Sequence, residues 1–214
     1  MPNWCENTLT VQGPVTQLRA FKKKVHGRAS AELQDQCLSF ETTVPQPKQY
    51  DNPDGWYNWR LAHWGTKWDA SDPVLEVTAD SLVYKFDTAW GPPREWLEET
   101  VKKFPALTFR LFYAEGGMDF AGIVYGEDGE CTTEEKAGYV EGMIEEYGSY
   151  SACCESCDGE LVIENVNDQR TCEECLAHVC VHCHKRDTEH EAGKCLFDAT
   201  TFKALKDADE EDTA

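Results

Sequence analysis

Seven cysteines and one histidine near the C-terminus have the residue types and the spacing of zinc ligands. Six of the cysteines form three C-x-x-C pairs, and a histidine and a further cysteine follow them. The two-residue gap lets both thiolates of a pair bind one tetrahedral zinc ion at about 2.3 Å. Eight ligands are enough for two closed sites, which are structural because they leave no position for water or substrate. The predicted ligands of two zinc ions are Cys154, Cys157, Cys172, Cys175, Cys180, Cys183, His190 and Cys195.

The segment around these ligands has few large apolar side chains, so buried free cysteines do not explain the array. A module of about 45 residues without a core of its own usually needs a staple such as a metal. Two pairings stay open: a cross-brace joins the first C-x-x-C pair to the third, and a ribbon joins the first to the second. Alternative ligands are Cys153, His178, His182 and His184.

The hydrophobic pattern of residues 1–130 predicts an α+β domain. Alternating or β-prone segments predict strands, at residues 7–12, 38–44, 74–78, 82–87, 107–113 and 120–125. Helical spacing predicts helices at residues 15–26 and from Pro92-Pro93, which opens the second helix, to Pro105, which stops it. Without the strand at 38–44, the order is that of a ferredoxin-like split βαβ sandwich. Residues 46–72 break the pattern and predict an insertion with a short helix around residues 56–63.

Four segments are predicted along the chain. Residues 1–130 form the ferredoxin-like domain, and residues 131–150 form a connecting helix whose start is indicated by a capping box at residues 132–135. Residues 151–198 form the double-zinc module. Residues 199–214 form a short helix and an acidic tail.

The composition limits the cellular compartments in which the protein is expected. No apolar run approaches the roughly 20 residues of a membrane span, and no basic and apolar leader opens the chain. Eleven cysteines in C-x-x-C spacing then favour metal binding in a reducing, cytoplasmic compartment.

The charge is strongly negative and unevenly distributed. The net charge is −20, with 19 acidic and 13 basic residues in 1–130 and 21 acidic and 7 basic residues in 131–214. Lys22, Lys23 and Lys24 form the only dense basic run, and we expect them on the exposed face of a helix. Direct nucleic-acid binding is therefore disfavoured, and a partner with a basic surface is permitted.

Four motifs of the N-terminal half resemble a known family. They are residues 1–10 (MPNWCENTLT), 56–69 (WYNWRLAHWGTKWD), 86–93 (FDTAWGPP) and 114–122 (AEGGMDFAG). Together they resemble the YubB-type ferredoxin-like family of plasmids and bacteriophages. The resemblance covers about residues 1–130 and implies a ferredoxin-like fold without an iron–sulfur cluster, and it brings no catalytic residues. Residues 171–195 resemble B-box fingers of the RING-like cross-brace group, which mediate protein association.

The aromatic motifs contain candidate ligand-binding residues. Polar side chains walled by tryptophans would suit a small molecule or a peptide, and a histidine beside carboxylates could perform acid–base chemistry. The competing interpretation makes the tryptophans core and the charges buried pairs. The candidate cleft comprises Trp59, Arg60, His63, Trp64, Lys67, Trp68, Asp69, Asp87, Trp90, Glu115 and Asp119.

These features favour an interaction protein over an enzyme. The leading hypothesis is a zinc-binding accessory protein of a phage or plasmid that binds a host protein in the bacterial cytoplasm, with DNA mimicry by its carboxylates as one version. The alternative is an enzyme or a small-ligand sensor that uses the tryptophan-rich cleft, with His63, Asp87 and Asp119 close together.

Overall fold

The computed structural model describes residues 3–27, 36–53, 55–136, 138–153, 160–163, 170–171 and 178–179. The chain divides into two compact units, Met1–Tyr139 and Val140–Ala214, which we describe separately.

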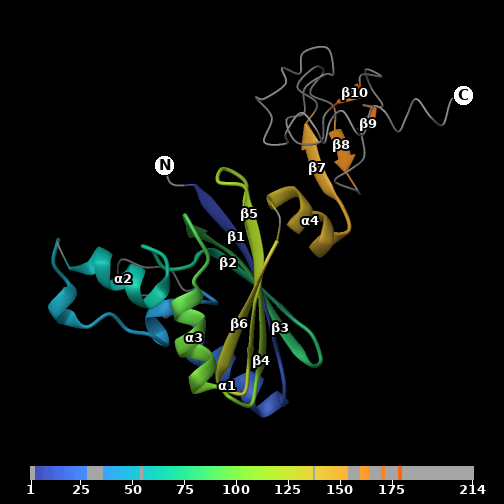
Figure 1. The fold of residues 1–214 in the computed structure, drawn as a ribbon. Coiled ribbons are helices and arrows are strands. Elements are labelled where there is room, and N and C mark those ends of the chain that lie inside the picture. Colours follow the sequence, from blue (N-terminus) through green and yellow to red (C-terminus); the bar gives the residue numbers. More distant parts are fainter. Residues whose placement is uncertain are drawn as a thin grey trace, which may run out of the picture. The chain divides into compact units, whose positions relative to one another are not determined.

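The first unit is built on a six-stranded antiparallel sheet (Figure 1). The strand order is β2-β3-β1-β4-β5-β6. The order β2-β3-β1-β4, joined by two helical crossovers, is the ferredoxin-like arrangement, and β5 and β6 extend the sheet beyond β4. The predicted α+β ferredoxin-like fold is therefore confirmed. The strands are β1 (Trp4–Gln12), β2 (Ser71–Val77), β3 (Ser81–Ala89), β4 (Thr108–Glu115), β5 (Phe120–Glu127) and β6 (Glu130–Glu135).

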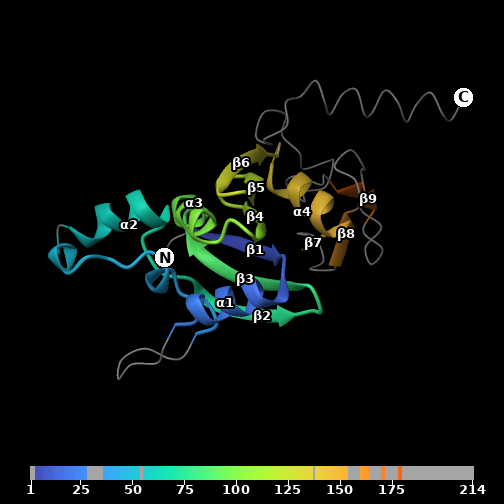
Figure 2. The ribbon, with the colours of Figure 1, turned by 90° about the horizontal axis from the view of Figure 1, so that it is seen from below.

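Helices α1 (Val15–Val25) and α3 (Arg94–Lys103) pack on one face of the sheet. Figure 2 shows α1 beside β3 and α3 toward the β5–β6 edge. α1 buries Leu18, Phe21 and Val25, whose spacing places them on one side of the helix. Phe21 lies at the centre of this layer, with its ring 5.2 Å from that of Phe104 and 5.5 Å from that of Phe109. Burial of this shared apolar face holds the helices against the sheet.

The insertion between α1 and β2 contains helix α2 (Trp56–Trp64), as predicted, and the short 3-10 helices η1 (Phe40–Thr42) and η2 (Lys48–Tyr50). Figure 1 shows α2 beyond α3, away from the sheet. The strand predicted at residues 38–44 is wrong, because these residues turn into η1 instead of extending. The Asp69 carboxylate accepts the Phe40 N–H at 2.6 Å, and the Phe40 carbonyl accepts the Val44 N–H at 2.9 Å.

The helix start predicted at residues 132–135 is also wrong. These residues belong to β6, where Thr132 pairs with Tyr125 and Glu135 with Gly122. Asp128 and Gly129 have φ values of 51° and 86°, which fit a tight hairpin turn of the Asp-Gly kind. Pairing with β5 therefore overrides the local capping signal, and a helix begins only at Tyr139.

The second unit contains α4 (Tyr139–Tyr147), which begins at the unit boundary, and two short strand pairs. β7 (Tyr150–Cys153) pairs with β8 (Glu160–Ile163), and β9 (Arg170–Thr171) pairs with β10 (His178–Val179). All eight predicted zinc ligands lie outside the described residues, as do residues 199–214.

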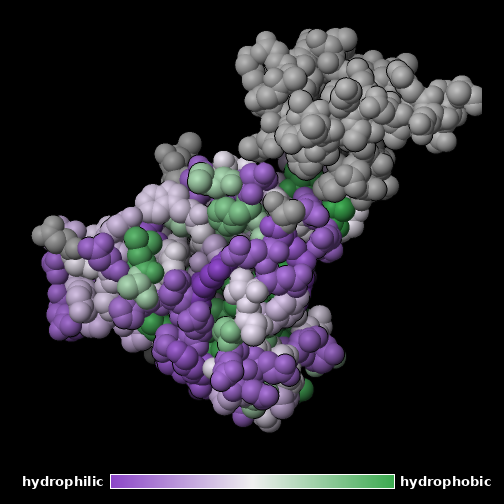
Figure 3. All heavy atoms as spheres, viewed as in Figure 1, coloured by the Kyte–Doolittle hydropathy of each residue, from purple (hydrophilic) through white to green (hydrophobic). Residues whose placement is uncertain are grey.

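None of the helices in the described ranges is long and apolar enough to cross a membrane. In Figure 3, hydrophilic residues cover much of the visible face of the part that the structure describes, and hydrophobic residues form smaller groups between them.

Candidate functional site at one end of the sheet

The four sequence motifs come together at one end of the sheet. Trp90 of the third motif donates its N–H to the Asn3 carbonyl of the first motif at 2.9 Å. The Trp4 ring lies 5.8 Å from the ring of Trp68, which belongs to the second motif. An added Cβ at Gly117 of the fourth motif would meet the Asn3 side chain. Segments that are far apart in sequence thus form one local structure.

A cluster of exposed tryptophans marks this end of the sheet. Trp4, Trp68 and Trp90 expose 41%, 38% and 44% of their surface. The Lys67 ammonium lies between two of them, 3.8 Å from the ring centre of Trp68 and 4.0 Å from that of Trp90. Cation–π attraction on both sides orders the lysine and both rings. We call these four residues the tryptophan cluster.

Trp90 has an unusual backbone conformation. Its φ of 73° lies in the left-handed region, which bulky residues rarely adopt. The hydrogen bond to Asn3 holds the backbone there. Strained positions of this kind concentrate at functional sites, so the outlier supports a role for the exposed Trp90 ring.

Two other candidate tryptophans are in the core. Trp59 and Trp64 expose 7% and 1% of their surface, so they do not wall an open cleft with Trp68 and Trp90. Trp64 packs edge-on to Phe40 and donates its indole N–H to the Val44 carbonyl at 2.8 Å. The interpretation of tryptophans as core therefore holds for this pair.

The polar candidates on α2 lie beside these core rings. His63 stacks on Trp59 with ring centres 4.3 Å apart, and its Nδ1 lies 2.8 Å from the Trp59 carbonyl oxygen. The Arg60 guanidinium lies 4.8 Å from the ring centre of Trp64, and its Nε donates to Gln46 at 2.7 Å. Both side chains are held by contacts within the insertion.

Asp69 organises the insertion. Its carboxylate accepts hydrogen bonds from the Ser39 hydroxyl at 2.6 Å and from the N–H groups of Phe40 and Ala70 at 2.6 and 2.8 Å. Burial raises the pKa of Asp69, and these hydrogen bonds oppose the rise. All three hydrogen-bond donors belong to the segment between α1 and β2. Asp69 therefore stabilises the fold of the insertion.

Asp87 belongs to a second group of carboxylates, beside the tryptophan cluster. It faces Glu6 across the β1–β3 pair, next to the strand that carries Trp4. Burial raises the pKa of Asp87, and the neighbouring charges of Glu6 and Asp72 raise it further. None of the ion pairs among the described residues includes these three carboxylates.

Glu115 and Asp119 shape the turn between β4 and β5. The buried Glu115 carboxylate accepts the N–H groups of Gly117 and Met118, each at 2.7 Å. Asp119 accepts the Tyr139 N–H at 3.0 Å. His63, Asp87 and Asp119 therefore each have contacts in a different neighbourhood, and no contact joins any two of them in the part of the chain described.

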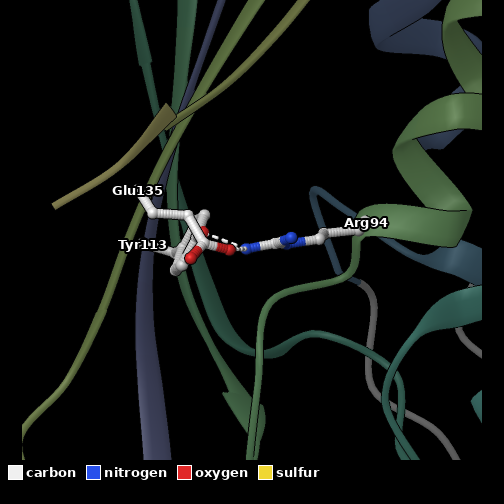
Figure 4. A network of polar contacts seen from close by, with 3 residues as sticks. All are labelled: Arg94, Tyr113 and Glu135. Carbon is white, nitrogen blue, oxygen red and sulfur yellow. Dashed lines mark hydrogen bonds and ion pairs between the residues drawn. The ribbon is translucent and has the colours of Figure 1, made fainter. Parts of the chain in front are cut away.

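A cleft that the sequence did not reveal lies on the helix-covered side of the same end of the sheet. It has a volume of about 360 Å³ and is lined by the first turn of α3, the loop before it and strands β4 to β6. The Arg94 guanidinium lies 5.0 Å from the ring centre of Tyr113 and donates to the Tyr113 hydroxyl. Its other partner is Glu135, at 3.4 Å (Figure 4). The charged residue directly after Pro92 and Pro93, at a helix start, was the available sequence signal.

Arg94 also affects the ionisation of its neighbour. Burial raises the pKa of Tyr113, and the positive charge and hydrogen bond of Arg94 partly counteract this. The cleft thus contains a neutral phenol beside a guanidinium, a pair that can donate hydrogen bonds to an anion.

Comparison with known proteins agrees with the fold. Residues 63–148 match the sequence model of a family described as the ferredoxin-like domain in Api92-like protein. The crystal structure of the protein Api92 from Yersinia pseudotuberculosis is similar, with a TM-score of 0.53 and 10% identity over 64% of this chain and 99% of that chain. A search of curated proteins found no match. Both likenesses support a ferredoxin-like domain. At 10% identity the structural likeness concerns the fold.

Proposed function

We propose that this chain is an accessory protein that acts by binding a partner protein, and that the tryptophan cluster is its contact surface. The observation that carries the proposal is the exposure of Trp4, Trp68 and Trp90 side by side on a fixed backbone. Tryptophan is enriched among the residues that dominate protein–protein binding energy. Rings held in place before binding lose little conformational entropy when the partner arrives.

The charge around the cluster favours a basic segment of the partner. Glu6, Asp72 and Asp87 lie together beside Trp4, and the repulsion among them would be relieved by a lysine or arginine side chain. The exposed Trp4 ring can also attract such a cation, whereas the rings of Trp68 and Trp90 already hold Lys67. The net charge of −20 supports the same preference over the whole chain.

The remaining parts of the proposal come from the sequence. A bacterial host protein in the cytoplasm would be the partner if the chain belongs to a phage or plasmid, as its resemblance to the YubB-type family implies. DNA mimicry, in which carboxylates occupy a basic site of the host protein, is one version. Residues 151–198 would bind two structural zinc ions through the eight predicted ligands and present a second acidic contact surface.

Affinity capture with matched variants tests the contact surface. The full chain is used to capture proteins from a bacterial lysate at low and at moderate salt, and recovered proteins are identified by mass spectrometry. Trp68→Ala should weaken capture of the partner by roughly thirtyfold, since loss of a binding hot spot costs about 2 kcal/mol. The matched control is Val77→Ala, which truncates a side chain that is 57% exposed on β2.

Two results would contradict the proposal. One is a specific partner that Trp68→Ala retains as well as the unmodified chain does. The other is recovery of no partner at either salt concentration. Thermal unfolding of the variants, followed by far-UV circular dichroism, serves as the control for folding, because Trp68→Ala itself removes a fluorophore.

A further inference from the structure

The cleft beside α3 has the properties of a small-molecule site that is separate from the tryptophan cluster. Its volume of about 360 Å³ lies within the range of small-ligand pockets. Pro92, Phe120 and the ring of Tyr113 supply apolar wall, and Arg94, Glu95 and Glu135 supply charge. An apolar body with one charged group would match such a lining.

Two glycines make room for the polar groups of this cleft. A Cβ at Gly122 would collide with the Tyr113 hydroxyl and would lie 2.8 Å from a backbone carbonyl oxygen of β6. A Cβ at Gly65 would collide with the Glu95 carboxylate, and Gly65 has a φ of 80°, which favours glycine. The absence of these two side chains therefore keeps the hydroxyl and the carboxylate in place at the cleft.

The charges in the cleft select the kind of ligand. Arg94 and Lys136 line it together with Glu95 and Glu135, so the formal charges balance. Lys136 is paired with Glu134 at 2.7 Å, whereas the Arg94–Glu135 pair is longer, at 3.4 Å, so Arg94 is the cation more readily available to a ligand. Two nearby carboxylates would repel a dianion such as phosphate more strongly than a monoanion.

The contact with Glu135 shows that the Arg94 guanidinium can pair with a carboxylate. The Glu135 carboxylate lies 3.4 Å from the guanidinium and its side chain is 75% exposed, so it is a weakly held internal partner. A ligand carboxylate could instead bind the guanidinium through two parallel hydrogen bonds. The first turn of α3, which has no side-chain cap, adds a favourable dipole for an anion.

We propose that this cleft binds a small monocarboxylate with an apolar body. The ligand carboxylate replaces Glu135 on Arg94 and accepts a hydrogen bond from the Tyr113 hydroxyl, while the apolar body lies against Phe120 and Pro92. Through this site the protein would bind a small ligand independently of partner binding at the tryptophan cluster.

Calorimetric titration of the full chain with benzoate tests the proposal, with benzamide as the neutral analogue and inorganic phosphate as the competing anion. Benzoate should bind, benzamide should not, and phosphate should bind more weakly than benzoate. Arg94→Gln should lower benzoate affinity by about tenfold or more, because a hydrogen bond to a charged group is lost. Arg94→Lys should give an intermediate loss, since it keeps the charge but not the two-pronged geometry.

Glu135→Gln provides the distinguishing result, because it removes the internal competitor. Benzoate affinity should rise by about threefold, in line with the small free energy of an exposed ion pair. Glu130→Gln is the matched control: it removes the same charge from an exposed position of β6, and should leave affinity unchanged. Tryptophan fluorescence checks that each variant is folded.

The proposal would be overturned by absence of benzoate binding, by phosphate or benzamide binding as tightly as benzoate, or by equal affinity of Arg94→Gln and the unmodified chain. A loss of affinity in Glu135→Gln would also overturn it. None of these results bears on partner capture through Trp68, so the two proposals fail separately.

Discussion

At the scale of residues, tryptophans of one short segment have opposite roles. Trp64 is buried with its indole N–H bonded to a carbonyl, whereas Trp68, four positions later, is half-exposed in the tryptophan cluster. Both belong to the aromatic motif of residues 56–69. Their spacing in the sequence gives no reason to assign one to the core and the other to the surface. The difference arises because α2 ends at Gly65, after which the chain changes direction.

Cys5 carries a residue-scale prediction on pH. Burial raises the pKa of its thiol to about 12, against about 8.5 in an unfolded chain. Between these values the folded state keeps the proton and the unfolded state loses it, so this stabilising contribution is complete below about pH 8.5 and is lost as pH rises.

The comparison of unmodified chain with Cys5→Ala isolates this effect. From pH 8 to pH 11, the free energy of unfolding of the unmodified chain should fall by about 1 kcal/mol or more relative to that of Cys5→Ala. The free energy of unfolding is measured by denaturant unfolding under reducing conditions. Tryptophan fluorescence monitors the transition, because all seven tryptophans lie in residues 4–96. Parallel pH profiles of the two proteins would contradict the prediction.

At the scale of elements, local signals were correct where no distant partner intervened. The hydrophobic spacing of residues in α1 and α3 predicted both helices. The capping box at residues 132–135 misled, because those residues gain more from hydrogen bonding to β5 than from starting a helix. The Asp-Gly pair before β6 was the competing signal for a hairpin.

Gly65 and Gly129 show two different reasons for a glycine where a helix or strand ends: backbone conformation and close packing. Both have positive φ, but an added Cβ at Gly129 meets open space, and at Gly65 it would lie 2.9 Å from the Pro92 carbonyl oxygen. Gly129→Ala should therefore cost about 1 kcal/mol for its backbone conformation alone. Gly65→Ala should cost about 1 to 2 kcal/mol more because the packing must shift.

Urea unfolding followed by tryptophan fluorescence measures both variants. Equal destabilisation by the two substitutions would show that close packing between the end of α2 and the loop before α3 contributes nothing measurable.

At the scale of the whole molecule, the acidic charge and the cysteines concentrate in the second half. Residues 131–214 hold 21 acidic and 7 basic side chains, and the eight predicted zinc ligands lie among them. Structural zinc binding supplies folding free energy directly, so a zinc module would fold and unfold with its metal while the ferredoxin-like domain keeps its own apolar core.

Metal analysis and chelation test this division. The purified chain should contain two zinc equivalents, Cys172→Ser with Cys175→Ser should lower that number to one or less, and Cys131→Ser, in β6, should keep two. A chelator should make residues 151–198 sensitive to trypsin and leave the tryptophan fluorescence unchanged. One equivalent in the unmodified chain would mean that the second site is misassigned, and none would refute the zinc module.

The sequence by itself determined the ferredoxin-like order of elements and the two main helices, because each depends on hydrophobic periodicity within a few residues. The insertion with α2 was predicted where that pattern breaks, at residues 46–72. The sequence also marked the four motifs that form one end of the sheet. Only the tertiary structure decided which aromatic side chains are core and which are surface, and that Arg94, Tyr113 and Glu135 share a cleft. These three residues lie on α3, β4 and β6, and their proximity follows from strand order and packing, which local sequence patterns do not specify.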